Sequence, residues 1–303
     1  MGNHSVHLEN PSGRLLISIL LNGLITLVEI VGGIFSNSLA LISDAIHNLS
    51  DTLALILAWI ANKVGVREPD AKRTFGYKRF EILSAFINAS VLTAISLYLI
   101  YEAIIRFLHP EPVKSGLMFI IAVIGLFVNL FSMLFLHRDS KKSLNVKAAY
   151  VHLLGDTLSS VAVIGGAILI YFTQIVWIDP LLTLIISIII IVQAYKILHE
   201  STDILMQSTP QNLNLEEIKT HLEKHPLVKN IHHVHCWRLQ DHDVLFEAHI
   251  ETSKDLLLSE SRELVAEIDG VLREKFHITH TTLQVEFEVC EDKAMIKRAK
   301  EEQ

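Results

Sequence analysis

Two histidine–aspartate pairs stand out among the residues that could do chemistry. His47 and Asp51 are four residues apart, as are His152 and Asp156, and both pairs lie in the pattern H-x-L-x-D-T-L. Residues four apart on a helix project from one face, so each pair offers an imidazole nitrogen and a carboxylate oxygen together. Two converging pairs would supply the tetrahedral nitrogen and oxygen set that zinc accepts. The four residues are therefore predicted to bind a divalent metal ion.

Long apolar stretches must position these pairs. The chain has 303 residues, of which 50% are hydrophobic and 19% charged, and its mean hydropathy of +0.40 is typical of a membrane protein. Crossing a bilayer takes roughly 20 helical residues. We expect an all-α bundle of six transmembrane helices within residues 15–205, after a cytoplasmic tail of residues 1–14. The six predicted spans are 15–35, 39–62, 80–108, 116–136, 148–172 and 177–198.

Basic residues are concentrated in the loops on one side of these spans. The loop at 63–79 holds six and the loop at 138–147 holds four, whereas the opposite loops hold only Arg106 and Lys114. The positive-inside rule then places both termini in the cytoplasm. The two H-x-L-x-D-T-L patterns are 105 residues apart, so two halves of three spans would run in opposite directions, as in transporters with inverted repeats.

Counting about 1.5 Å per residue along the predicted spans places Asp51 and Asp156 near the middle of a membrane core about 30 Å thick. A charged side chain at mid-membrane costs on the order of 3 kcal/mol, so a metal ion or protons must neutralise the carboxylates. Metal binding needs ionised carboxylates and neutral imidazoles, and loading therefore releases protons. This linkage predicts zinc/proton exchange if the site faces each side in turn. The alternative is a set of interhelical hydrogen bonds. Asp44, three residues before His47, is expected to support the site rather than to bind the metal directly.

The C-terminal part of the chain has a different composition. The last 105 residues carry 12 basic and 21 acidic residues, which favours cations over nucleic acid or anionic lipid as partners. Residues 210–290 are predicted to form a small α+β cytoplasmic domain, followed by a charged tail of residues 291–303. The predicted helices cover 213–224 and 259–276, and the predicted strands cover 228–239, 244–251 and 281–289.

Histidines in this domain suggest a second metal site. His233 and His235 share one face of a regular strand, His249 lies on the next strand where it could sit opposite, and Glu286 lies on the third. The alternative is that these histidines are solvated or stack between strands. Neither of the two cysteines, Cys236 and Cys290, belongs to a C-x-x-C pair, so a thiolate zinc site is not indicated.

The segment from Ser38 to Asp51, SLALISDAIHNLSD, resembles the second-span signature of the cation diffusion facilitator family, in its zinc-efflux branch. The segment TFGYKRFE at 74–81, His152-x-x-x-Asp156 and Asp179-Pro180 also match. The resemblance implies a homodimeric metal/proton antiporter with a metallochaperone-like, ferredoxin-like cytoplasmic domain. It implies four transport ligands: His47, Asp51, His152 and Asp156.

The sequence departs from the family pattern in three places. Where some bacterial members have loop ligands, this chain has Asp70, Arg73 and Tyr77, so no loop site is predicted. Gln284 replaces a histidine ligand of the cytoplasmic domain. The histidine-rich loop that many eukaryotic members have between the fourth and fifth spans is missing, which favours a prokaryotic protein in the plasma membrane. His235, His249 and Glu286 match family ligand positions, and His280 is one place out of register. The tentative cytoplasmic set is His235, His249, His280 and Glu286, in a site that is incomplete or shared across the dimer.

Three other functions compete with zinc export. Cd²⁺ or Co²⁺ could be a main substrate, because nitrogen and oxygen sites discriminate poorly among these ions. A membrane-anchored metal sensor is a second alternative. An intramembrane metallohydrolase would need an open coordination position and a general base, whereas four protein ligands are present and no H-E-x-x-H motif occurs. We therefore do not predict an enzyme. The expected partners are divalent metal ions, protons, the lipid bilayer and a second copy of the chain.

Overall fold

The computed structural model describes residues 13–65, 67–136, 144–240, 243–289 and 294–296. Nearly all of the predicted tail at 1–14 and most of the tail at 291–303 therefore lie outside the described residues. The chain divides into two compact units. The first unit contains residues 1–60 and 84–198, and the second contains residues 61–83 and 199–303.

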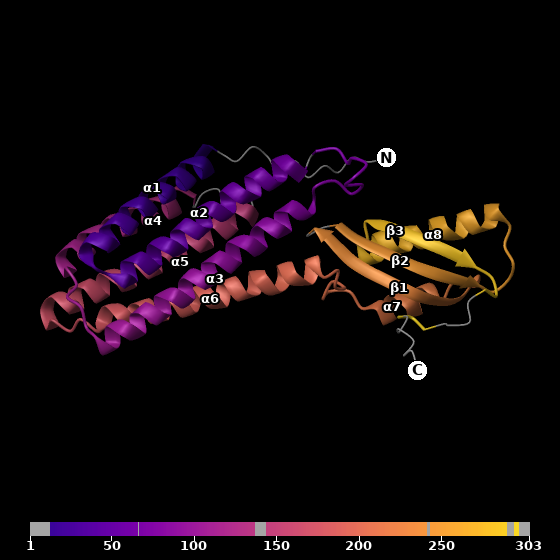
Figure 1. The fold of residues 1–303 in the computed structure, drawn as a ribbon. Coiled ribbons are helices and arrows are strands. Elements are labelled where there is room, and N and C mark those ends of the chain that lie inside the picture. The colour runs from indigo at the N-terminus through magenta and orange to yellow at the C-terminus, as the bar shows by residue number, and fades with distance from the viewer. Residues whose placement is uncertain (1–12, 66, 137–143, 241–242, 290–293, 297–303) are drawn as a thin grey trace. The chain divides into compact units, whose positions relative to one another are not determined.

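Long helices form the first unit and lie alongside one another (Figure 1). Within the described residues there are six: α1 (Gly13–Ser36), α2 (Leu39–Gly65), α3 (Arg79–Leu108), α4 (Ser115–Leu136), α5 (Leu144–Thr173) and α6 (Ile178–Leu205). Their bounds follow the predicted apolar stretches closely, except at the end of α6. That helix continues beyond residue 198 into a more polar segment, HESTDIL, which a hydropathy criterion does not detect.

The helical unit has an apolar surface, and its interior contains buried polar side chains beside apolar ones. On α1, Leu20, Leu24 and Leu27 are 60–68% exposed, whereas Thr26 and Glu29 are fully buried. Exposed apolar and buried polar side chains suit a lipid environment, in which helices associate through small and polar side chains. Four segments with described side chains are long and apolar enough to cross a membrane, and Leu20–Ser36 is a shorter apolar segment. The four are Arg79–Leu108, Ser115–Ser132, Leu154–Thr173 and Ile178–Leu205. The unit is a transmembrane helical domain.

The start of α2 is fixed by a neighbouring helix. Asn37 takes a left-handed conformation with φ of 58° in the short turn after α1, which asparagine tolerates better than most residues. The buried carboxylate of Asp179, in the first turn of α6, then accepts hydrogen bonds from Ser38 Oγ (2.5 Å) and from the backbone amides of Leu39 and Ala40. An anion at a helix N-terminus satisfies unpaired amides and complements the helix dipole.

The second unit contains a small mixed sheet. Its C-terminal elements are α7 (Leu215–Leu222), β1 (Val228–Gln240), β2 (Asp243–Thr252), α8 (Leu258–Phe276) and β3 (His280–Glu286). The described strands lie in the order β1-β2-β3, with β1 antiparallel and β3 parallel to β2. The parallel pairing follows from α8, because parallel neighbours need a crossover connection. Both helices pack on one core with the strands, through residues such as Ile218 and Leu272.

Candidate metal centres

His47, Asp51 and Asp156 converge inside the helical unit. The helical spacing puts His47 and Asp51 on one face of α2, with Nδ1 and Oδ2 3.6 Å apart. Asp156 approaches from α5, and its Oδ1 lies 3.7 Å from His47 Nε2. One ligand atom from each of the three residues lies within 4.8 Å of the others. Ligand atoms about 2.0–2.1 Å from a tetrahedral zinc ion lie about 3.4 Å apart, so the three side chains would have to move closer together to hold one ion through a single nitrogen of His47.

The exposure of the three side chains differs. Asp156 is 1% exposed, His47 14% and Asp51 24%, so the cluster is buried on the α5 side and more open at Asp51. His152 lies on α5, one helical turn before Asp156. The side chain of His152 is outside the described part of the structure, and its role as a fourth ligand stays a prediction.

Hydrogen bonds join α2 to neighbouring helices close to this cluster. Ser159, on α5, donates to the buried carboxylate of Asp44, which ties α2 to α5 beside the ligands. Ser43 on α2 and Ser187 on α6 are 3.3 Å apart through their hydroxyls. Small polar side chains thus join the helix that carries His47 to two of its neighbours, as expected where hydrophobic burial cannot drive helix association.

In the loop between α2 and α3, the three positions that match ligands in some family members bind one another. Asp70 Oδ1 accepts hydrogen bonds from the backbone amides of Lys72 and Arg73 (2.7 and 2.8 Å). These bonds hold the pKa of the Asp70 carboxyl below its ordinary value. The Arg73 guanidinium donates to the Tyr77 hydroxyl (3.2 Å). The loop is therefore organised by its own hydrogen bonds.

A second cluster lies on the sheet of the other unit. His232, His233 and His249 each place a ring nitrogen within 4.8 Å of the others. Glu286 joins them, with Oε1 2.7 Å from His249 Nδ1 and Oε2 3.4 Å from His232 Nε2. Three imidazoles and a carboxylate are ligand types that zinc accepts.

A β-bulge explains why the side chains of His232 and His233 both reach this cluster, although the two residues are adjacent in sequence. His232 pairs with His249 and His235 pairs with Glu247, so β1 advances three residues while β2 advances two. The extra residue lies between them, where His233 has φ of 50°. The spacing of the core-facing residues changes at the same point, because Ile231 and Val234 both pack in the core although they are three residues apart.

The bulge alters the residue set relative to the sequence prediction. His249 and Glu286 are brought together as expected, but His235 and His280 are exposed and lie outside the cluster. His233 and His235 do not share a face of a regular strand, because the bulge intervenes. The sequence carried a signal for this: the apolar residues Ile231, Val234 and Cys236 are spaced by three and then two, which a regular strand would not show.

Burial affects two titratable groups on β1, one of which belongs to this cluster. Desolvation lowers the pKa of His232, although the Glu286 carboxylate opposes that effect. His232 is therefore held in its neutral form, which is the form that binds metal. On the same strand, burial raises the pKa of the Cys236 thiol to about 11, so this cysteine is a poor ligand at neutral pH.

Comparison with known protein families assigns both parts of the chain. Residues 15–206 match the model of the cation efflux transmembrane domain, and residues 210–288 match that of the cation efflux protein cytoplasmic domain. The chain belongs to the cation efflux family. This family, also called the cation diffusion facilitator family, is one of transporters, and the resemblance noted in the sequence is confirmed.

Several bacterial relatives of this cation efflux protein match over most of their length. The metal cation efflux system protein CzcD of Cupriavidus metallidurans is 39% identical, over 93% of this chain and 90% of its own. The cadmium, cobalt and zinc/H⁺-K⁺ antiporter of Bacillus subtilis is 39% identical, over 95% and 93% of the two chains. The zinc transporter ZitB of Escherichia coli is 38% identical, over 93% and 90%.

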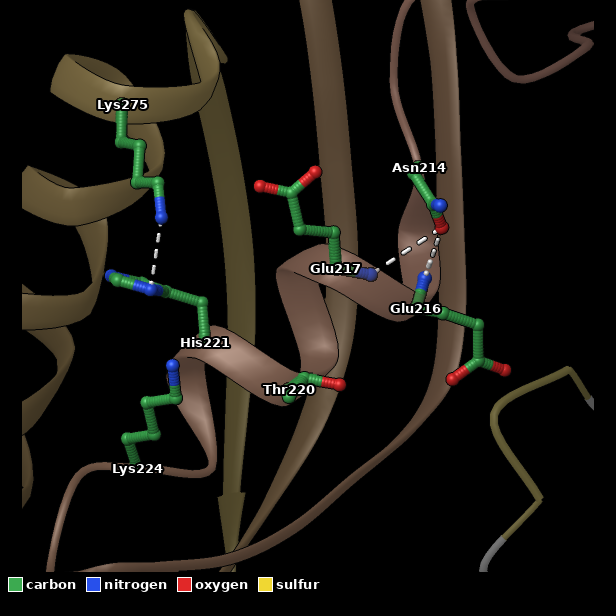
Figure 2. Close-up of a pocket in the computed structure, with 7 residues that line it drawn as sticks. All are labelled: Asn214, Glu216, Glu217, Thr220, His221, Lys224 and Lys275. Carbon is green, nitrogen blue, oxygen red and sulfur yellow. Dashed lines mark hydrogen bonds between the residues drawn. The ribbon is translucent and has the colours of Figure 1, made fainter.

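The cation efflux protein also has a surface pocket of about 420 Å³ between α7 and α8 (Figure 2). Its ammonium groups include Lys275, whose Nζ lies 3.0 Å from His221 Nδ1, and Lys224. Two carboxylates, Glu216 and Glu217, also line the pocket and balance these positive charges, and the lining residues belong to neither metal cluster. We assign the pocket no part in metal binding.

Proposed function

We propose that this protein exports Zn²⁺ from the cytoplasm in exchange for protons, by alternating access around an intramembrane site. The observation that carries this proposal is the convergence of His47, Asp51 and Asp156 from two helices of the transmembrane domain. His152 completes the proposed set of two histidines and two aspartates.

Zinc is the preferred substrate because the donor set combines imidazole nitrogen with carboxylate oxygen. The names of the relatives favour the same ion, since ZitB is named a zinc transporter. The Bacillus subtilis relative is named for cadmium and cobalt as well as zinc. Cd²⁺ and Co²⁺ are therefore the competing substrates.

Proton exchange follows from the chemistry of the ligands. Loading the site requires ionised carboxylates and neutral imidazoles, whereas unloading leaves carboxylates at membrane depth, where protonation is favourable. The name of the Bacillus subtilis relative, which includes H⁺, supports this exchange.

The proposed arrangement has all six long helices crossing the membrane of a bacterium, with both termini in the cytoplasm. Residues 15–205 would form the transport domain. Residues 210–290 would form a cytoplasmic domain of ferredoxin-like type that binds regulatory metal and pairs two copies of the chain. For that metal we propose a set drawn from the described cluster: His232, His233, His249 and Glu286.

The test is metal flux in vesicles that contain the purified protein and carry an imposed pH gradient. Wild type would be compared with Asp51→Ala and Asp156→Ala, with Zn²⁺, Cd²⁺, Co²⁺ and Mn²⁺ supplied in turn. The control is His235→Ala, which removes an exposed histidine outside both clusters. We expect zinc flux and proton counterflow in wild type and the control, and neither in the aspartate variants.

Two results would overturn the proposal. Zinc flux that persists in both aspartate variants would rule out the intramembrane site. A wild-type protein that moves no metal, while its cytoplasmic domain binds zinc, would favour the metal-sensor alternative.

A further inference from the structure

Glu29 is a buried carboxyl group in the interior of the helical unit. It lies on α1 and is fully buried. Its Oε2 accepts a hydrogen bond from Asn48 Nδ2, on α2 (3.0 Å). Its Oε1 is buried too, and has no hydrogen-bond partner among the described residues.

A glycine on α4 makes room for the second oxygen. A Cβ atom built on Gly125 would lie 2.3 Å from Glu29 Oε1, which is far inside contact distance. Any side chain at position 125 would therefore displace the carboxyl group. The packing of α1, α2 and α4 thus fixes the position of the Glu29 carboxyl group. Its Oε2 accepts a hydrogen bond from the Asn48 amide, and its Oε1 lies beside Gly125.

The electrostatic surroundings of Glu29 do not suit a permanent negative charge. Among the side chains that the structure describes, the titratable groups close enough to act on it are both acids, Asp44 on α2 and Asp156 on α5. Asn48 is neutral, and α4 presents Gly125. Within the described residues, Glu29 has no ion pair with a lysine, arginine or histidine. A buried carboxylate without a compensating charge takes up a proton instead.

The neighbouring metal site would reverse this preference. Asn48 directly follows His47, and Asp156 is one of the three clustered residues. A divalent cation held there brings two positive charges near Glu29, and an opposite charge favours the ionised form of a carboxyl group. The proton then leaves as the metal arrives and returns as the metal departs. Glu29 itself bonds to Asn48 and not to a ligand.

We propose that Glu29 is a proton-exchanging residue of the transport cycle, protonated while the metal site is empty and ionised while it is filled. This inference rests on the proposed zinc/proton exchange. It assigns one of the exchanged protons to a residue outside the ligand set. A purely structural role, in which Glu29 only joins α1 to α2, predicts no change in the proton count when the group is made unable to titrate.

The test uses Glu29→Gln, which keeps the size of the side chain and an oxygen acceptor for Asn48 but cannot titrate. The full-length protein is reconstituted in vesicles with the membrane potential held at zero by potassium and valinomycin. For each imposed pH difference, one measures the zinc concentration ratio at which net flux stops. The slope of its logarithm against the pH difference is the number of protons exchanged per zinc ion.

We expect the slope to fall by one in Glu29→Gln. The matched control is Asn129→Ala, which removes another buried interhelical hydrogen bond, to Ser160, but no titratable group, and should keep the wild-type slope. An unchanged slope in Glu29→Gln would overturn the inference while leaving zinc/proton exchange intact. A wild-type protein without coupled flux would instead overturn the proposed function.

A second measurement decides the case if Glu29→Gln folds but does not transport. Protons released on zinc binding are counted in detergent with a pH indicator in weak buffer, with Asn129→Ala again as the control. We expect Glu29→Gln to release fewer protons per bound zinc ion than wild type. Equal release by the two proteins would overturn the inference.

Discussion

The carboxylate of Asp179 accepts a hydrogen bond of 2.8 Å from the backbone amide of Leu39, the first residue of α2. The two residues are 140 positions apart in sequence, so this contact ties the N-terminus of α2 to the first turn of α6. His47 and Asp51 lie two to three helical turns further along α2. The contact therefore fixes the position from which the ligand-bearing helix starts.

Replacing Asp179 is expected to destabilise the helical unit. Asp179→Ala leaves buried donors of Ser38, Leu39 and Ala40 without their acceptor, at a cost of about 2 kcal/mol. Asp179→Asn keeps an oxygen acceptor and should cost less. The measurement is the melting temperature in detergent. Asp203→Ala, which removes a partly exposed ion pair with His199, should have a small effect. Equal melting temperatures for Asp179→Ala and Asp203→Ala would contradict the capping role.

The cytoplasmic cluster predicts which histidines bind metal. His233→Ala should weaken zinc binding to the cytoplasmic domain by at least about tenfold, whereas His235→Ala and His280→Ala should leave it unchanged. Zinc affinity would be measured in a background of Asp51→Ala with Asp156→Ala, so that only this site contributes. The reverse pattern would favour the set predicted from the sequence.

The stability of the metal-free cytoplasmic domain should fall in acid. Burial holds the pKa of His232 below its ordinary value of 6.5, so between the folded pKa and 6.5 the unfolded chain binds more protons than the folded chain. Stability is complete above pH 6.5 and is lost as the pH falls through the folded pKa. Melting temperatures measured with chelator between pH 5 and 8 should show this dependence.

The matched variants for this pH dependence are His232→Gln and His235→Gln. The first removes the buried imidazole and should flatten the pH profile, while the second removes an exposed one and should not. If the two variants have the same profile as wild type, another group is responsible for the acid sensitivity.

Cys236 should be unreactive in the folded protein. Burial raises the pKa of its thiol from an ordinary 9.0 to about 11, which alone lowers the thiolate fraction at neutral pH by about 100-fold. In a Cys290→Ser background, a thiol reagent should react more than about 100-fold faster with the denatured chain than with the folded chain. Comparable rates in the two states would show that β1 opens readily.

The intramembrane cluster was accessible to sequence analysis because its geometry is local. His47 and Asp51 depend only on helical spacing, and the repeated pattern identified Asp156 as their counterpart. The contacts that support the cluster were less accessible. The pairing of Ser159 with Asp44, or of Asn48 with Glu29, depends on how helices rotate against one another, and no periodicity within one helix specifies that rotation.

The cytoplasmic cluster was predicted only in part for a different reason. Alternation along a regular strand places His233 and His235 on one face, and a single inserted residue cancels that rule for every residue beyond it. The third strand that carries Glu286 was predicted, but its parallel pairing with β2, which brings Glu286 to His249, was not. The order of the elements was thus predictable, whereas the local backbone conformation at His233 was not.

The backbone beyond β3 returns to the outer edge of β1. The amide of His233 donates to the carbonyl of Ala294 (3.3 Å), and that of Val234 donates to the carbonyl of Met295 (2.7 Å). An open sheet edge is a template for pairing with another molecule. This short segment therefore shields the edge strand at its irregular point, and its loss would expose a surface prone to aggregation, independently of any effect on metal transport.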